Sequence, residues 1–305
     1  SILFSFHRWA YGIRKMVRQI RPDLIICEAD NIPSTRVLDQ AFPNIPLVVL
    51  QAALLNDDPK KYLPVKRCAV KSFFRNLLAP IFDPIRRPPK FFGLNHPRHH
   101  IFAFGERTKR IYKGSPPAHL YLVGYPLIER SAFTEGKFIT ILLPVDALKT
   151  DDHRHFDDFI ALAQAFPDEK FILKPHPRSD WHYIVQKANE LKISNVTFEH
   201  GQDFASLAKQ SKLCVSAFSF ADFNFLAAGV PMIRHRRNDF MFFESWFSGS
   251  AIARTYNVKE LIQSVRNQLS HPTLVGHEDY LTDIFSHLGE QSVQATISAI
   301  DDVLA

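Results

Sequence analysis

The feature that most constrains the fold is a regular alternation of short apolar runs with segments of helical spacing, which begins at Phe138 and continues over the next ~150 residues. Glycine, proline, asparagine or aspartate separates the runs, as is typical of strands. Strict alternation of strand and helix predicts an α/β fold with a parallel, doubly wound sheet. The predicted strands are residues 138–143, 170–173, 195–198, 212–215, 230–233 and 251–253.

The N-terminal half carries a shorter version of the same pattern. An apolar run at 24–27, a helix at 33–42 and a second apolar run at 47–50 form a strand–helix–strand unit. Such a unit predicts a parallel pair with a right-handed crossover. The other predicted elements of this half are an Arg- and Lys-rich amphipathic helix at 7–20 and strands at 101–105 and 120–126.

The length of 305 residues favours two domains over one. We place the boundary after residue 133, because the strand at 120–126 has ended and a new strand–helix series begins shortly afterwards. The predicted parts are an N-terminal domain at 1–133 with a basic, aromatic insertion at 56–95, a second domain at 134–285, and a C-terminal helix at 286–305 that packs back towards the first domain.

Composition excludes several classes of protein. The hydrophobic share is 46% and the charged share 22%, as in ordinary globular proteins, and no apolar run has the roughly 18 residues that a membrane-spanning helix needs. Cys27, Cys68 and Cys214 are isolated in the sequence. Cys27 and Cys214 lie within apolar runs, which indicates small buried side chains in a reducing compartment. The 14 histidines show no metal-ligand spacing, so we expect no metal site.

The net charge of +6 suits nucleic acid, an anionic membrane surface or a phosphorylated ligand. The insertion at 56–95 interleaves cations with aromatic residues, a combination that suits contact with an anionic membrane; the alternative is a helical hairpin packed on the domain. No nucleic-acid module is recognisable, so no nucleic-acid partner is expected. The predicted membrane-contact residues are Lys66, Arg67, Lys71, Phe73, Phe74 and Arg75.

The stretch from Phe171 to Arg178 changes abruptly from an apolar strand to Lys174-Pro-His176-Pro-Arg178. Proline fixes φ and removes an N–H, so the chain is expected to leave the sheet as a stiff loop with three side chains that can be cationic. Ligands of open α/β sheets bind beyond the carboxyl ends of the strands. The stretch therefore predicts a site for a phosphate-bearing ligand, with a plain basic turn as the alternative.

The loop after the strand at 212–215 supplies a second candidate for this site. It carries Ser216 and Ser219 and leads directly into a helix, whose free N–H groups favour phosphate oxygens. Asp222 could bind ribose hydroxyls. The alternative is that the serines only cap the helix and that Asp222 is solvated.

These motifs occur in an order that resembles the donor-binding half of GT-B transferases of bacterial envelope polymers. The residues concerned are Lys174-Pro-His176-Pro, the segment from Ser216 to Asp222, and Ala228-Gly229-Val230-Pro231. The sequence is similar to CDP-glycerol glycerophosphotransferases and to capsular Kdo transferases and polysialyltransferases. The resemblance covers roughly residues 120 to 300.

The resemblance implies a GT-B fold of two Rossmann-like domains that face a cleft, with an abbreviated N-terminal domain on the acceptor side. It implies a nucleotide-activated donor, CDP- or CMP-linked in the named relatives, and no separate cofactor. The residues assigned to donor binding are Lys174, His176, Arg178, Ser216, Ser219 and Asp222. Where relatives commonly have Gln-His-Gly, this chain has Gln51-Ala52-Ala53, so that histidine is absent.

Group transfer needs a base that takes the proton of the acceptor hydroxyl. Glu28 and Asp30 follow the strand at 24–27 and are the candidates, with His176 as a further catalytic group; Glu28 could instead cap a helix or lie in solvent. No Asp-x-Asp metal motif is present, and cations with a helix N-terminus can neutralise the leaving group.

The sequence thus predicts metal-independent transfer of a sugar or polyol-phosphate unit to an envelope polysaccharide or lipid-linked acceptor. The enzyme is expected in the cytoplasm, peripheral to the inner face of the bacterial cell membrane. The alternatives are a nucleotide-sugar epimerase of the same fold and a non-catalytic, membrane-associated partner in polysaccharide export.

Overall fold

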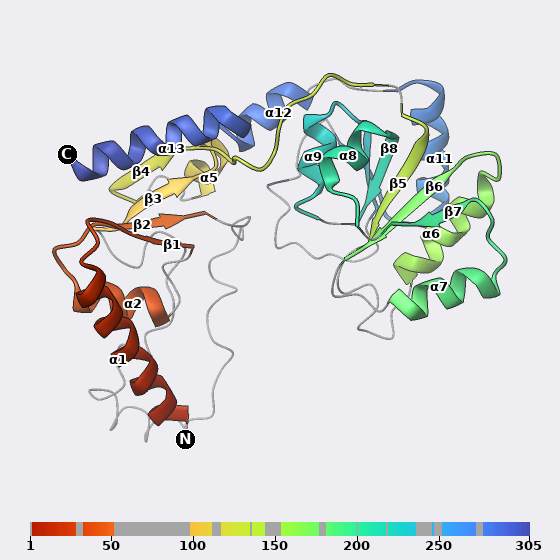
Figure 1. Cartoon of the computed structure of the whole chain (residues 1–305). Helices are drawn as coiled ribbons and strands as arrows, with labels where there is room; N and C mark the ends of the chain where they lie inside the picture. The colour runs from red at the N-terminus through yellow and green to blue at the C-terminus, as the bar shows by residue number, and fades with distance from the viewer. Residues whose placement is uncertain are drawn as a thin grey trace, which may run out of the picture. The chain divides into compact units, whose positions relative to one another are not determined.

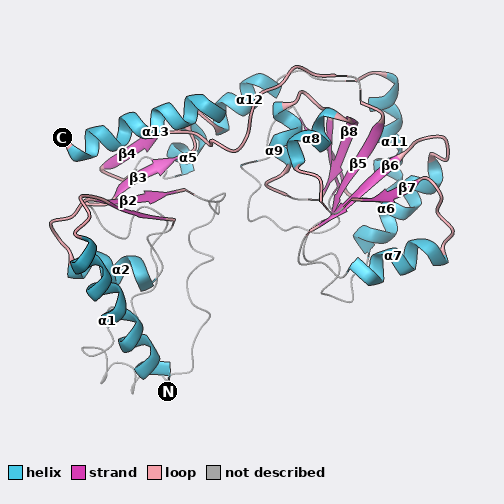
Figure 2. Cartoon of the chain, viewed as in Figure 1, coloured by secondary structure: helices cyan, strands magenta, loops and turns pink. Residues whose placement is uncertain are grey.

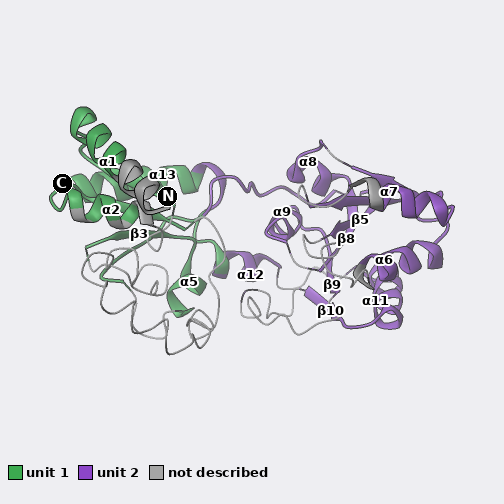
Figure 3. Ribbon diagram, turned by 90° about the horizontal axis from the view of Figure 1, so that it is seen from below, with its two compact units in different colours: residues 1–124, 284–287, 291–305 green, residues 125–283, 288–290 purple. Residues whose placement is uncertain are grey.

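The computed structural model describes residues 2–28, 33–51, 98–111, 117–134, 136–143, 154–176, 181–199, 201–217, 219–235, 246, 252–272 and 277–305. The chain forms two compact units, which Figure 3 distinguishes by colour. Unit 1 comprises residues 1–124, 284–287 and 291–305, and unit 2 comprises residues 125–283 and 288–290.

The division between the units falls at Gly124, earlier than the boundary after residue 133 that the sequence suggested. The intervening segment belongs to unit 2 because it packs there. The ring of Tyr125 lies 4.9 Å from that of Phe220, and the N–H of Ser131 donates to the carbonyl of Ala227.

Unit 1 is built on a parallel four-stranded sheet in the order β1-β2-β3-β4 (Figures 1 and 2). Its elements in chain order are α1 (Ile2–Ile20), β1 (Ile25–Cys27), α2 (Pro33–Ala41), β2 (Leu47–Leu50), β3 (His100–Ala103), α5 (Glu106–Ile111), β4 (His119–Leu122) and most of α13 (Gly289–Leu304).

Alternate residues of these strands face two different layers of helix. Val48 and Phe102 pack with Ala299 of α13 on one face. Val49 packs with Leu38 of α2 on the other face, and Figure 1 shows α13 and α2 on opposite sides of the sheet. The C-terminal helix therefore completes the core of a unit whose strands all lie near the start of the chain.

Unit 2 contains a parallel six-stranded sheet in the order β10-β9-β8-β5-β6-β7. Its elements are β5 (Phe138–Leu143), α6 (Arg154–Ala165), β6 (Phe171–Pro175), α7 (Trp181–Glu190), β7 (Val196–Phe198), α8 (Phe204–Lys209), β8 (Ser211–Ser216), α9 (Asp222–Ala227), β9 (Met232–His235), β10 (Ile252–Thr255), α11 (Val258–Ser270) and α12 (His277–Ile284).

The core of unit 2 lies mainly on one face of this sheet. Ile141, Val215 and Ile233 point to that face and pack with Phe159 of α6 and Leu261 of α11. The residues between them in each strand point to the opposite face, where Figure 1 shows α8 and α9. The two faces therefore carry different side chains, which decides where polar groups gather.

No helix in the described parts of the chain combines the length and the apolar character needed to cross a membrane.

Candidate functional site

The strand order of unit 2 indicates where a ligand would bind. The chain proceeds from β5 outwards to β6 and β7, then returns to the other side of β5 and proceeds through β8, β9 and β10. This is the order of a dinucleotide-binding sheet, and the reversal places the topological switch point between β5 and β8. Ligands of such sheets bind at the carboxyl ends of the strands on either side of that point.

Polar side chains lie in a single row across this end of the sheet. The register pairs Leu142 of β5 with Lys174 of β6 and with Ser216 of β8, and it pairs Ser216 with Arg234 of β9. Registered neighbours in parallel strands point to the same face. The row therefore brings one hydroxyl and two cations to the side of the sheet that α8 and α9 cover.

Ser216, Asp222 and Arg234 form the candidate site, which we call the polar cluster. All three are buried, with exposed fractions of 0%, 1% and 4%. The Ser216 Oγ and the Asp222 Oδ1 are enclosed and make no hydrogen bond to any described residue. Such atoms are costly to bury without a partner, which makes them candidates for binding a ligand.

Burial raises the pKa of Asp222 from 3.8 to about 7. The Ser216 hydroxyl, the N–H of Ser219 and the charge of Arg234 oppose this rise, in that order of importance. The hydroxyl acts by proximity, since its geometry is not that of a hydrogen bond. The cluster thus offers a carboxyl group that can accept or donate near neutral pH.

Ser219 shapes the turn before α9 and does not cap that helix, whose N-cap residue is Ala221. Its Oγ accepts from the N–H of Ala221 at 3.2 Å, and its own N–H donates to the Asp222 Oδ2 at 3.3 Å. Both groups are therefore engaged in shaping the turn that precedes α9. A ligand phosphate would have to share them, whereas the buried Ser216 hydroxyl makes no hydrogen bond to any described residue.

Lys174 and Pro175 are part of β6, so the chain leaves the sheet later than the sequence suggested. Proline is accommodated because it ends the strand, where the missing N–H interrupts no further pairing. The Lys174 Nζ donates to the Gln202 carbonyl at 2.6 Å and lies over the ring of Phe204. Lys174 therefore connects β6 to the loop before α8, and burial lowers its pKa.

His176 follows β6 directly and is half-buried, at the same end of the sheet as the polar cluster. Arg178, the third predicted cation of this stretch, lies outside the described residues. The structure thus brings His176 and Ser216 to one edge of one sheet and directs Lys174 to a neighbouring loop.

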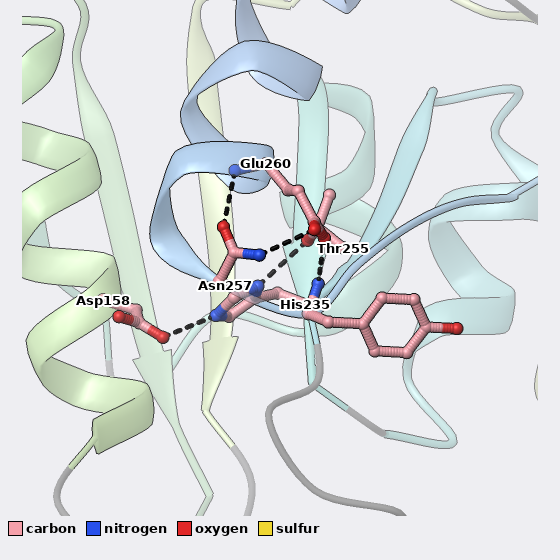
Figure 4. Close-up of polar contacts among 6 residues, drawn as sticks. Asp158, His235, Thr255, Asn257 and Glu260 are labelled. Carbon is pink, nitrogen blue, oxygen red and sulfur yellow. Dashed lines mark hydrogen bonds and ion pairs between the residues drawn. The ribbon is translucent and has the colours of Figure 1, made fainter.

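A second buried polar group lies on the opposite face, next to Arg234 in sequence (Figure 4). The His235 Nε2 lies 2.7 Å from the Asp158 Oδ2, and its Nδ1 lies 2.9 Å from the Thr255 Oγ1. Asp158, His235 and Thr255 are at most 3% exposed by residue. We read this trio as a connection between α6, β9 and β10 that holds the strand carrying Arg234.

The loop after β10 is also fixed by polar contacts (Figure 4). The Asn257 side chain accepts from the N–H of Glu260 at 3.0 Å and so caps α11. The carboxylate of Glu260 accepts from the N–H of Tyr256 at 2.8 Å. These contacts fix the turn between β10 and α11, which suits the preorganisation that a binding site requires.

Of the site residues predicted in unit 1, the structure describes only Glu28. Glu28 directly follows β1 and is exposed. Asp30 and all six predicted membrane-contact residues, Lys66, Arg67, Lys71, Phe73, Phe74 and Arg75, lie outside the described residues.

Gln51, which precedes the missing histidine position, has a structural role. Its Oε1 accepts from the N–H of Phe104 at 3.0 Å and from the hydroxyl of Thr108 at 2.9 Å. It is 5% exposed and joins the end of β2 to the turn that begins α5. Gln51 thus stabilises unit 1, and this role does not depend on a histidine at position 52.

Gln51→Ala is expected to cost about 2 kcal/mol of unfolding free energy, because two buried donors lose their acceptor. Gln186→Ala is the matched control, since its amide donates only to Glu190 on an exposed helix surface, and its effect should stay within about 0.5 kcal/mol. Urea unfolding measures both. Equal losses in the two variants would contradict the role given to Gln51.

Sequence reasoning missed Arg234 as a site residue and missed the trio around His235. Arg234 lies in an apolar strand context, and only the register of β8 and β9 shows that it neighbours Ser216. A charged residue directly after the predicted strand at 230–233 was the available signal, because a charge that becomes buried needs a partner or a ligand.

The fold was compared with those of known proteins. No protein-family model and no curated protein matches the sequence. Among solved structures, the glycotransferase of kitacinnamycin has a TM-score of 0.66 at 14% identity, over 97% of this chain and 80% of its own. The calicheamicin glycosyltransferase has a TM-score of 0.61 at 15% identity, over 97% and 76%.

The UDP-GlcNAc 2-epimerase of Methanocaldococcus jannaschii, solved with UDP-GlcNAc and UDP, has a TM-score of 0.58 at 14% identity, over 96% of this chain and 79% of its own. At such low identities the likeness concerns the fold. The chain has a GT-B fold made of two Rossmann-like α/β units, as the sequence predicted.

Proposed function

We propose that unit 2 binds a nucleotide-activated donor at the carboxyl ends of β5 and β8, and that the protein transfers the activated group. The observation that carries this proposal is the buried Ser216 hydroxyl, which makes no hydrogen bond within the described chain and lies beside Asp222 and Arg234 at the switch point. A ligand diphosphate would accept from Ser216 and be neutralised by Arg234. Asp222 would accept from a ribose or sugar hydroxyl.

Further residues complete the proposed donor site. His176 lies at the same sheet edge, and in its protonated form it can donate to the phosphates. Ser219, Lys174 and Arg178 remain proposed donor-binding residues. Ser219 and Lys174 would contact the donor with polar groups that already form hydrogen bonds within the protein. The base that accepts the acceptor proton is proposed to be Glu28 or Asp30, with His176 as a further catalytic group.

For the acceptor we propose an envelope polysaccharide or a lipid-linked precursor, as the resemblance to CDP-glycerol glycerophosphotransferases and capsular transferases implies. The transferred unit is then a sugar or a polyol phosphate, from a CDP- or CMP-linked donor and without metal or cofactor. The protein would work in the cytoplasm at the inner face of the bacterial cell membrane, without a nucleic-acid partner.

The test is calorimetric titration of the full chain with CDP, CMP, UDP and GDP. Ser216→Ala should weaken binding of the preferred nucleotide by about 10- to 100-fold, since a hydrogen bond to a charged group contributes roughly 1.5–3 kcal/mol. Stability should change little, because the hydroxyl makes no hydrogen bond within the described chain and acts on Asp222 only by favouring its ionised form. His176→Ala should weaken binding similarly.

Ser211→Ala is the matched control on the same strand. The Ser211 Oγ contacts the Thr140 Oγ1 at 2.6 Å and the Leu207 carbonyl at 2.7 Å, far from the carboxyl end. This variant should lose stability and keep its affinity. If no nucleotide binds the wild type, the donor site is refuted and the non-catalytic partner becomes the better account.

An epimerase is the second candidate, favoured by the fold shared with the UDP-GlcNAc 2-epimerase from Methanocaldococcus jannaschii. The two activities differ in what they need. An epimerase converts a nucleotide sugar when no acceptor is added, whereas a transferase leaves the sugar configuration of the unused donor unchanged. Product analysis with the preferred nucleotide sugar alone therefore separates them.

A further inference from the structure

Helix α1 exposes large apolar side chains that a helix of a globular protein normally buries. Tyr11 is 69% exposed, Met16 50% and Ile20 65%. Met16 and Ile20 are separated by one helical turn and therefore form a continuous apolar strip. Val17 is 6% exposed and marks the buried side of the helix, which packs against α2.

The same helix exposes a group of cations without counter-charges. Arg14, Lys15 and Arg18 are all exposed, and none forms an ion pair within the described parts of the chain. The sequence of α1 contains no aspartate or glutamate. Cations spaced three or four residues apart repel one another and destabilise a helix unless an anionic partner neutralises them.

Cations and apolar groups share the solvent-facing side of α1. Projected at the helical spacing, Lys15 lies between the strip of Met16 and Ile20 and the row formed by Arg14 and Arg18. This arrangement suits a surface that is anionic at its polar layer and apolar just beneath, as a bilayer is. A nucleic acid would satisfy the cations and leave Met16 and Ile20 in water.

We propose that α1 lies in the plane of an anionic lipid membrane, with Arg14, Lys15 and Arg18 at the headgroups and Met16 and Ile20 at the acyl boundary. These residues differ from those in the insertion at 56–95 for which the sequence predicted membrane contact, and that insertion lies outside the described residues. The proposal does not rest on nucleotide binding, so it can fail or succeed independently of the donor site.

The test is co-sedimentation of the full chain with phosphatidylcholine vesicles that do or do not contain phosphatidylglycerol. Binding is expected only with phosphatidylglycerol, and it should weaken in high salt. The combined variant Arg14→Gln, Lys15→Gln and Arg18→Gln should bind about a hundredfold more weakly. Each cation near an anionic surface contributes roughly 1 kcal/mol, and a factor of ten corresponds to about 1.4 kcal/mol.

The matched charge control removes three exposed cations of unit 2, by Lys170→Gln, Lys209→Gln and Lys259→Gln, and should retain binding. An equal loss in this control would show attraction by net charge alone and overturn the proposal. Vesicle binding that the α1 charge variant leaves unchanged would also overturn it. Tight binding of a single-stranded RNA oligonucleotide that the α1 variant abolishes would reassign the helix to nucleic acid.

A second pair of variants tests the apolar contribution. Met16→Ser with Ile20→Ser should weaken vesicle binding at least about tenfold, because two apolar side chains no longer leave water on binding. The control is Ile297→Ser with Leu304→Ser on α13, which are 48% and 49% exposed in the same unit. Equal vesicle binding by the α1 double variant and the α13 double variant would overturn insertion of α1. The affinity for nucleotide should be the same in all of these variants.

Discussion

Gly124→Ala is expected to destabilise unit 1 by at least about 3–4 kcal/mol, the largest effect that we predict for a single substitution. Gly124 has a φ of +81°, where an L side chain is strained by roughly 1–2 kcal/mol. A Cβ at this position would also lie 1.9 Å from the carbonyl oxygen of His287. Backbone atoms cannot move aside as a side chain can, so the returning segment at 284–287 must shift.

The control for this prediction is Gly12→Ala within α1. Nothing lies within 4 Å of the position that its Cβ would occupy, and alanine favours a helix interior over glycine by roughly 0.5–1 kcal/mol. The two variants make the same chemical change with opposite expected signs. Urea unfolding that finds Gly124→Ala as stable as the wild type would refute the close approach of the chain at this glycine.

Asp222→Asn is expected to stabilise the protein at alkaline pH and to weaken its affinity for the donor. In the folded protein the pKa of Asp222 is about 7, against 3.8 for the free group, so its contribution to stability is complete below 3.8 and is lost as the pH rises through 7. Asparagine lacks this dependence. Between pH 5 and pH 8 the variant should gain about 2–3 kcal/mol relative to the wild type.

The affinity of Asp222→Asn for the preferred nucleotide sugar should fall by about 10- to 100-fold, because the carboxylate loses its charge-assisted hydrogen bond. Gain of stability with loss of binding is the combination expected of a residue retained for function. A stability difference that does not change with pH would contradict the burial of an ionisable group here.

Asp203→Asn is the matched control. Asp203 caps α8 by accepting from the N–H of Ser206 at 2.8 Å, which lowers its pKa, and asparagine caps helices equally well. A carboxyl group with a lowered pKa is already ionised throughout the range from pH 5 to pH 8. The stability difference between this variant and the wild type should therefore be constant over that range.

Local sequence pattern predicted most of the elements because apolar runs and helical spacing are local properties. The strands at 47–50 and 138–143 were predicted with the bounds that the structure has. The order of the strands was not predictable in the same way. Nothing in the sequence near β8 says that it returns to pair with β5 after β7 has extended the other side of the sheet.

The site was only partly predictable, because strand pairing brings together residues that are distant in the sequence. Ser216 was found because a serine at the end of an apolar run precedes a helix, and Asp222 lies within the same local motif. Arg234 acquires its position from the pairing of β8 with β9, and the hydrogen bond from Lys174 to Gln202 joins β6 to a loop that is distant in sequence. Three-dimensional register, not local composition, decides which charges meet.

Helix α13, which covers β2 and β3, follows unit 2 in the sequence, and this sets an order for events during translation. The strands of unit 1 leave the ribosome first but lack a cover for one apolar face until all of unit 2 has been made. Unit 2 can bury its own core in the meantime, because its contacts lie within a continuous stretch apart from three residues. We therefore expect unit 2 to fold before unit 1, although the strands of unit 1 are synthesised earlier. Until α13 has been made, unit 1 should be accessible to chaperones and proteases.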